Sequence, residues 1–152
     1  AVRAAADRPL LITGNSLGTT IALYVAAAVH VDGLILRNPP PLRELIVGRY
    51  GQWNLGLGAK LIAAQVPSEL NSILNAQLCT APCVWMTSGQ DRVVPPEYQQ
   101  MVIDAYAGSK KIVTLADADH ASPPVANELI DYARKLAWLQ EKIYRPKQAI
   151  RS

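Results

Sequence analysis

A short apolar run that turns directly into a helix-like pattern constrains this chain more than any other feature. The segment "LLITGNSLGTTIALYVAAAV" (10–29) begins with large apolar residues, stops at Gly14, and carries a hydroxyl at Ser16 before Gly18. Apolar residues then recur with a period of about 3.6. We therefore expect a buried strand, a tight turn and an amphipathic helix, in which Ser16 either caps the helix or is presented by the turn.

Similar apolar runs occur three more times along the chain. Strands are expected at 9–14, 33–38, 82–89 and 110–117, each bounded by Gly, Pro, Asn or Asp. The patterns predict helices after Ser16, over 95–108, and from Ser122, which can act as a cap, to Ile143. Strands that alternate with helices in this way predict a parallel α/β fold.

The stretch 39–81 interrupts this alternation. It has about forty residues, which is too long for an ordinary connection, and its pattern suggests two or three short helices over the ends of the strands. The 152 residues are enough for one core but not for two large ones. We expect a single domain over 1–152, with 39–81 as a helical cap insertion.

Composition excludes several classes of function. The chain is 50% hydrophobic with a net charge of +3, and its basic residues gather near the C-terminal end, so a nucleic-acid partner is not expected. No apolar stretch is long enough to span a membrane, and no targeting peptide is recognisable. Cys79 and Cys83 lack a second ligand pair, so we expect packing thiols and no metal site. The compartment stays open, with the cytoplasm favoured.

Reactive side chains follow three of the four expected strands. Ser16, inside the pattern G-x-S-x-G, comes after the first strand, Asp91 after the third, and Asp117, Asp119 and His120 after the fourth. Loops beyond the carboxyl ends of parallel strands meet at one edge of a sheet. A serine hydroxyl becomes a good nucleophile when an imidazole accepts its proton and a carboxylate orients that imidazole. The order therefore favours nucleophilic chemistry.

The turn around Ser16 fits this interpretation. A sharp strand-to-helix turn puts Ser16 in an unfavourable backbone conformation, and we expect Gly14 and Gly18 to make room for it. The backbone N–H of Leu17, at the start of the helix, would point toward an oxyanion on a substrate. His30, at the end of a helix, is expected at the surface.

The segments "LLITGNSLGTTIAL", "VWMTSGQDRVVPPE" and "LADADHASPP" resemble the serine-hydrolase branch of the α/β-hydrolase superfamily, in that order. The resemblance implies that Ser16 is the nucleophile, Asp91 the acid, His120 the base, and Leu17 an oxyanion donor. It implies that the four strands are strands five to eight of the family's sheet. No cofactor is implied. The expected reaction is hydrolysis of an ester or thioester through an acyl-serine intermediate.

The chain departs from that family on its N-terminal side. The first four strands are not present, nor is the loop that supplies a second oxyanion donor, so the first strand here would be an exposed apolar edge. We expect the missing half of the domain, or another chain, to complete the sheet. Asn15 stands where His is frequent, and Asn38 stands where some relatives carry the acid.

Several alternatives remain open from the residues alone. Asp91 could cap the helix that follows it, and Asp117 or Asp119 could compete for His120, although Asp91 is favoured. Four apolar residues of the insertion could line an acyl pocket or pack among themselves: Trp53, Leu55, Leu57 and Leu61. The chain could also be a non-catalytic binding module, or a peptidase or lyase that uses the same three residues.

Overall fold

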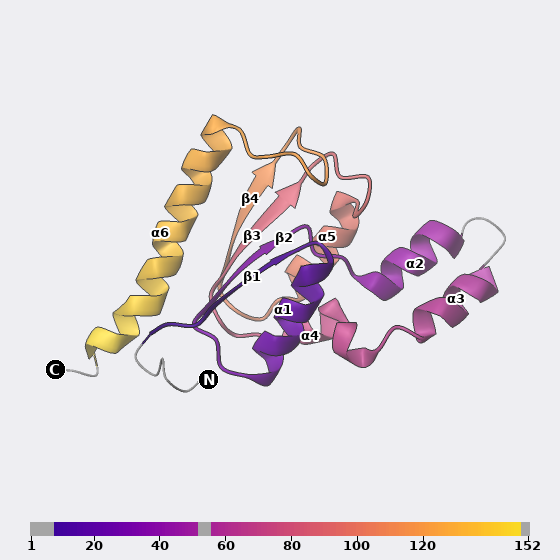
Figure 1. The fold of residues 1–152 in the computed structure, drawn as a ribbon, viewed down its shortest axis with the longest axis horizontal. Coiled ribbons are helices and arrows are strands. Elements are labelled where there is room, and N and C mark those ends of the chain that lie inside the picture. The colour runs from indigo at the N-terminus through magenta and orange to yellow at the C-terminus, as the bar shows by residue number, and fades with distance from the viewer. Residues whose placement is uncertain (1–7, 52–55, 150–152) are drawn as a thin grey trace.

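A computed structural model describes residues 8–51 and 56–149 of the chain. Its four strands form one parallel sheet in the order β1-β2-β3-β4, as Figure 1 shows. The strands are β1 (Leu11–Asn15), β2 (Gly33–Arg37), β3 (Cys83–Ser88) and β4 (Lys110–Leu115). Three of them lie inside the predicted runs, and β1 extends one residue beyond its run, to Asn15. The parallel α/β fold is therefore confirmed.

The helices are α1 (Leu17–Ala28), α2 (Leu42–Tyr50), α3 (Gly56–Ala64), α4 (Ser72–Leu78), α5 (Pro96–Ala105) and α6 (Ala126–Ala149), with a 3-10 turn η3 at Ser68–Leu70. Helix α6 packs on β3 and β4, and α1, α4 and α5 cover the opposite face of the sheet (Figure 1). The described part of the chain contains no helix that is long and apolar enough to cross a membrane.

Alternation along the central strands supplies a core to each face. Trp85 and Leu36 are fully buried in the cluster that includes α1, α4 and α5, while Val84 and Met86 belong to the cluster under α6. Successive side chains of a strand point to opposite faces, so a strand covered on both sides reads as a continuous apolar run. This two-sided burial explains why the strands were predictable.

The edge position of β1 was also expected. Among the described residues the strand pairs with β2 alone, and Leu11 keeps 45% of its surface exposed. The N-terminal strand is therefore an apolar edge among the described residues.

The insertion differs from its expected place in one respect. Its last helix, α4, packs against α1 and α5 and contributes Ala76 to the core, so it lies on a sheet face and not over the strand ends. Helices α2 and α3 pack on each other and extend away from the sheet in Figure 1. Leu57 and Leu61 are 83% and 67% exposed, so they are not packed inside the insertion. Trp53 and Leu55 lie outside the described residues.

The last helix begins later than predicted. We expected Ser122 to cap it, but α6 starts at Ala126. The Ser122 hydroxyl is instead bound to Asp119 Oδ1 at 2.7 Å, inside the loop that carries His120. Glu128 Oε2 accepts the Val125 N–H at 2.8 Å and so satisfies one donor at the real start of the helix.

Candidate active site

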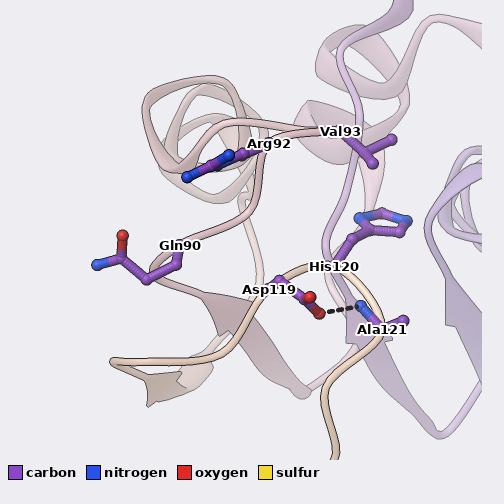
Figure 2. Close-up of a pocket in the computed structure, with 6 residues that line it drawn as sticks. All are labelled: Gln90, Arg92, Val93, Asp119, His120 and Ala121. Carbon is purple, nitrogen blue, oxygen red and sulfur yellow. Dashed lines mark hydrogen bonds between the residues drawn. The ribbon is translucent and has the colours of Figure 1, made fainter.

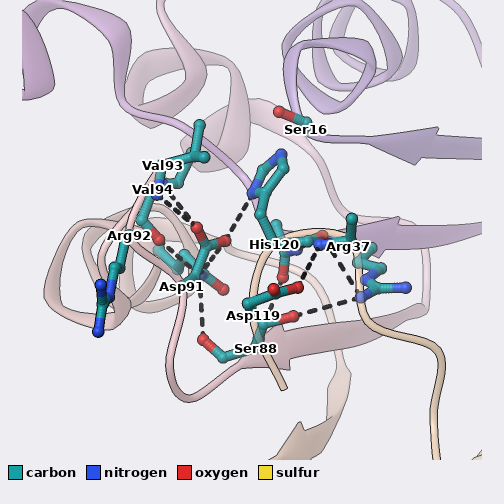
Figure 3. A network of polar contacts seen from close by, with 12 residues as sticks. Ser16, Arg37, Ser88, Asp91, Arg92, Val93, Val94, Asp119 and His120 are labelled. Atoms are coloured by element: carbon teal, nitrogen blue, oxygen red, sulfur yellow. Dashed lines mark hydrogen bonds and ion pairs between the residues drawn. The ribbon is translucent and has the colours of Figure 1, made fainter.

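The carboxyl ends of the strands bring the predicted reactive residues to one edge of the sheet. Ser16 follows β1 directly, Asp91 lies three residues beyond the end of β3, and His120 lies in the loop after β4. Figure 3 shows Ser16 on the side of the His120 ring away from Asp91. Three segments that are distant in sequence therefore meet at this edge, as predicted for parallel strands.

Ser16 has a backbone conformation that residues other than glycine rarely adopt. Its φ is 51° and its ψ is −124°, and its N–H donates to Arg37 O at 2.8 Å. Such backbone strain persists only where surrounding contacts impose it, and it concentrates at functional sites. The Ser16 side chain makes no capping hydrogen bond to α1. The simple capping interpretation of this serine is therefore wrong.

At only one of the two turn glycines would a larger residue clash with its neighbours. A Cβ on Gly14 would lie 2.8 Å from Gly18 O and 2.9 Å from Thr19 Cα, so the strand end and helix start can approach closely only with glycine there. A Cβ on Gly18 would meet nothing within 4 Å among the described residues. The expectation that Gly18 also prevents a clash is wrong, because its Cα faces open space.

Asp91 is buried, and four donors surround its carboxylate. The N–H groups of Val93 and Val94 donate to Oδ1 at 2.8 Å and 2.9 Å, which is the turn role considered for this residue. Oδ2 lies 2.7 Å from His120 Nδ1 and 3.2 Å from Gln99 Nε2. The same side chain thus orders its own loop and orients the imidazole (Figure 3).

The other two acidic candidates do not contact the imidazole. Asp119 Oδ1 accepts from the Ser122 hydroxyl and from the N–H groups of Ala121 and Ser122, within its own loop. These hydrogen bonds, that of the Ser122 hydroxyl first, lower the pKa of Asp119. Asp117 is exposed. The carboxylate that contacts His120 is therefore that of Asp91, not that of Asp119.

Two residues at the end of β2 hold the main chain of the His120 loop. Arg37 Nη2 donates to Ser122 O at 2.6 Å, and Asn38 Nδ2 donates to His120 O at 3.1 Å. Asn38 Oδ1 also accepts the Ser88 N–H at 3.0 Å, while its own φ is 50°. An amide supplies both the donor and the acceptor here, which a carboxylate does not.

Sequence reasoning missed Arg37, the structural role of Asn38, and Gln99. An asparagine directly after a strand is a signal for a left-handed backbone position, which Asn tolerates better than most residues. Nothing in the local sequence indicates that its side chain reaches a loop 82 residues further on. His30, by contrast, is 90% exposed at the opposite end of the sheet, as expected.

An open cavity of about 540 Å³ lies beside the imidazole (Figure 2). It is lined by Gln90, Arg92, Val93, Asp119, His120 and Ala121. Within the described residues no group of three or more His, Cys, Asp or Glu side chains is placed to hold a metal ion. Cys79 and Cys83 are free and buried, as predicted for packing thiols.

Comparisons with solved structures identify the fold. The chain aligns with the esterase domain of a Rhodothermus marinus protein at a TM-score of 0.60 and 16% identity, over 93% of this chain and 64% of that domain. It aligns with the Paleococcus ferrophilus monoacylglycerol lipase at a TM-score of 0.63 and 14% identity, over 93% of this chain and 72% of the lipase. It aligns with the Pyrococcus horikoshii acylaminoacyl peptidase at a TM-score of 0.64 and 16% identity, over 89% of this chain and 24% of the peptidase.

All three proteins have the α/β-hydrolase fold, and nearly all of the chain matches one part of that fold. It spans about two-thirds of the esterase domain and of the lipase, and about a quarter of the peptidase. No protein-family model and no curated protein sequence matches it.

Proposed function

We propose that this protein is a serine hydrolase in which Ser16, His120 and Asp91 form a catalytic triad. The observation that carries the proposal is the 2.7 Å contact between His120 Nδ1 and the buried Asp91 Oδ2, with Ser16 on the far side of the ring in a strained turn. A carboxylate on Nδ1 leaves the other ring nitrogen free to accept a proton. The Ser16 hydroxyl is not used as a helix cap and is available for attack.

The reaction then follows from these positions. His120 Nε2 accepts the Ser16 proton as Oγ attacks the carbonyl carbon, and the imidazolium formed is stabilised by Asp91. His120 returns that proton to the leaving alcohol or thiol, which leaves an acyl-Ser16 ester. Water then gives a proton to His120 as it attacks the acyl carbon. His120 passes that proton to Ser16 Oγ as the acyl–oxygen bond breaks, so the carboxylic acid is released and the free Ser16 hydroxyl is restored.

The oxyanion formed in each step needs hydrogen-bond donors. Leu17 is the first residue of α1, so its N–H lies at the positive end of the helix and has no partner within the helix. We assign one donor to Leu17. A second donor, and a neighbour for the exposed edge of β1, would come from the remainder of the domain or from another chain.

For the substrate we favour a carboxylic ester or thioester with an apolar acyl part. Two of the three structural neighbours are an esterase domain and a lipase, which supports this class. The acylaminoacyl peptidase supports a second candidate, hydrolysis of an acylated peptide by the same three residues. We propose that α2 and α3 form a cap beside this site.

A fluorophosphonate probe tests the proposal because it reacts with an activated serine. Labelling of the full protein is expected and should disappear in Ser16→Ala, since the attacking oxygen is removed. Ser68→Ala removes an exposed hydroxyl in η3 and serves as the matched control. No labelling of the folded full protein would identify it instead as a binding module with a hydrolase fold. Turnover of esters against acylated peptides then separates the two substrate classes.

A further inference from the structure

The Asp91 carboxylate accepts one side-chain hydrogen bond from a residue that is not part of the proposed triad. Gln99, the fourth residue of α5, is fully buried, and its Nε2 lies 3.2 Å from Asp91 Oδ2. That oxygen is the one that faces His120 Nδ1. The same Nε2 lies 2.7 Å from Val94 O and 3.5 Å from Ser88 O. The amide group of Gln99 therefore points its donor into the loop that carries the acid.

The orientation of this amide is determined by its surroundings. Three acceptors surround Nε2, so the reversed amide would set its oxygen against a carboxylate and two carbonyl groups. In the observed orientation Gln99 Oε1 is buried and has no hydrogen-bond partner among the described residues. Burying an amide oxygen without a partner is unfavourable. The donor side must compensate for that cost, which indicates that the N–H contacts matter.

We propose that Gln99 is a positioning residue that holds the Asp91 carboxylate in line with His120 Nδ1. Val93 and Val94 fix Oδ1 from one side, and Gln99 fixes Oδ2 from the other, so the carboxylate cannot rotate away from the imidazole. A donor on Oδ2 also favours the ionised carboxylate, which is the form that stabilises the imidazolium. This role rests on the proposed hydrolase function.

The first test is kinetic and uses the full protein. Gln99→Met keeps a similar length and volume but removes the donor, and we expect kcat to fall roughly 10- to 100-fold with KM unchanged, as for loss of a hydrogen bond to a charged group. Gln100→Met is the matched control, because Gln100 is the next residue of α5, is exposed, and donates to the exposed Asp104 at 2.6 Å. It should keep the wild-type kcat.

The second test reads the geometry without turnover. A proton held between His120 Nδ1 and Asp91 Oδ2 should give a proton NMR resonance far downfield of the amide region, assigned by its loss in His120→Gln. We expect this resonance to weaken or move upfield in Gln99→Met and to stay in Gln100→Met. A residue that only fills space would leave both the resonance and kcat unchanged.

The outcomes separate this proposal from the function on which it rests. If the wild type is not labelled by a fluorophosphonate, the hydrolase proposal fails, and the NMR comparison still decides the role of Gln99. Wild-type kcat and resonance in Gln99→Met would overturn the positioning role alone. If Gln99→Met does not fold, hydrogen exchange of the Gln99 side-chain amide in the wild type decides. Slow exchange supports the proposal, and exchange as fast as that of the exposed Gln100 contradicts it.

Discussion

At the scale of single residues, Asp91 combines two tasks that are usually assigned to different side chains. Its Oδ1 accepts two backbone N–H groups and so closes the turn after β3, while its Oδ2 meets His120. Replacing the whole side chain would therefore disturb the loop and the chemistry together. Separating them requires a variant that keeps one oxygen and changes the other.

Asp91→Asn is that variant. Its remaining oxygen can still accept from Val93 and Val94, but its NH₂ group would face His120 Nδ1, which favours the wrong imidazole tautomer. We expect a folded protein whose kcat falls by about 10³- to 10⁴-fold. Steady-state hydrolysis and a thermal melt check this. Asp117→Asn, an exposed change in the His120 loop, should keep the wild-type rate; an active Asp91→Asn would exclude Asp91 as the triad acid.

The two glycines of the Ser16 turn should respond oppositely to alanine. Gly14→Ala brings a methyl group to 2.8 Å from Gly18 O, which we expect to lower the free energy of unfolding by about 1–3 kcal/mol. Gly18→Ala meets open space inside α1 and should be neutral or stabilising by up to about 1 kcal/mol. Urea unfolding of both variants gives the comparison. If both variants lost the same free energy of unfolding, the clash of a Cβ at Gly14 could not be the cause.

The three residues of the proposed triad were predicted from the sequence, whereas the residues that hold them in place were not. Ser16, Asp91 and His120 each follow a buried strand, and parallel strands bring such positions together without any further information. Asn38 and Gln99 are different, because a hydrogen bond across 82 residues, or from a helix to a buried carboxylate, depends on the finished packing. Gly18 shows the limit of a motif, since its pattern suggests a clash that the structure does not contain.

At the scale of elements, the strands and the short helices of the insertion were predictable, but the packing of those helices was not. A strand buried on both faces needs apolar residues at nearly every position, and that requirement is visible in the sequence. Helix α3 (GLGAKLIAA) has fewer polar residues than α4 (SILNAQL), yet α4 packs on α1 whereas α3 exposes Leu57 and Leu61. Which short helix joins the core depends on neighbours that are distant in sequence.

The junction between α4 and β3 makes a prediction about pH. Burial raises the pKa of the Cys79 thiol to about 11, and burial followed by the neighbouring Cys79 raises that of Cys83. An unfolded thiol ionises near 9.0, so the folded state binds these protons more tightly. The stabilisation is complete below pH 9 and is lost as the pH rises toward 11.

We expect both thiols to be unreactive toward a thiol reagent at pH 8 in the folded protein and fully reactive in urea, because only the thiolate attacks. The free energy of unfolding should fall from about pH 9 upward, and less steeply in Cys79→Ala. Rapid modification of the folded protein at pH 8 would show that one of the two thiols is accessible and ionised.

At the scale of the whole molecule, helices cover both faces of the described sheet, and β1 leaves an apolar edge. Strand β4 ends the described sheet on one side with Val113 and Leu115 buried, whereas β1 ends it on the other side with Leu11 45% exposed. An apolar edge offers unpaired backbone groups to another strand. The chain aligns with only part of each of these structural neighbours.

Residues 1–152 produced alone should therefore self-associate in a concentration-dependent way, which sedimentation velocity measures. Thr13→Lys puts a charge on an exposed position of β1 and should shift the distribution toward the monomer. Gln140→Lys adds the same charge at an exposed position of α6 and should not. A monomer at all concentrations would show that the β1 edge does not pair.

The way in which β2 holds the His120 loop has a consequence for how this protein can change. Arg37 and Asn38 donate to carbonyl oxygens of His120 and Ser122, groups that every amino acid possesses. A substitution of a side chain in that loop therefore leaves these two acceptor groups in place. Ala121 lies between the two held carbonyls and lines the cavity, so under the proposed function a substitution there would change the wall of the substrate site while the backbone on either side of it stays held.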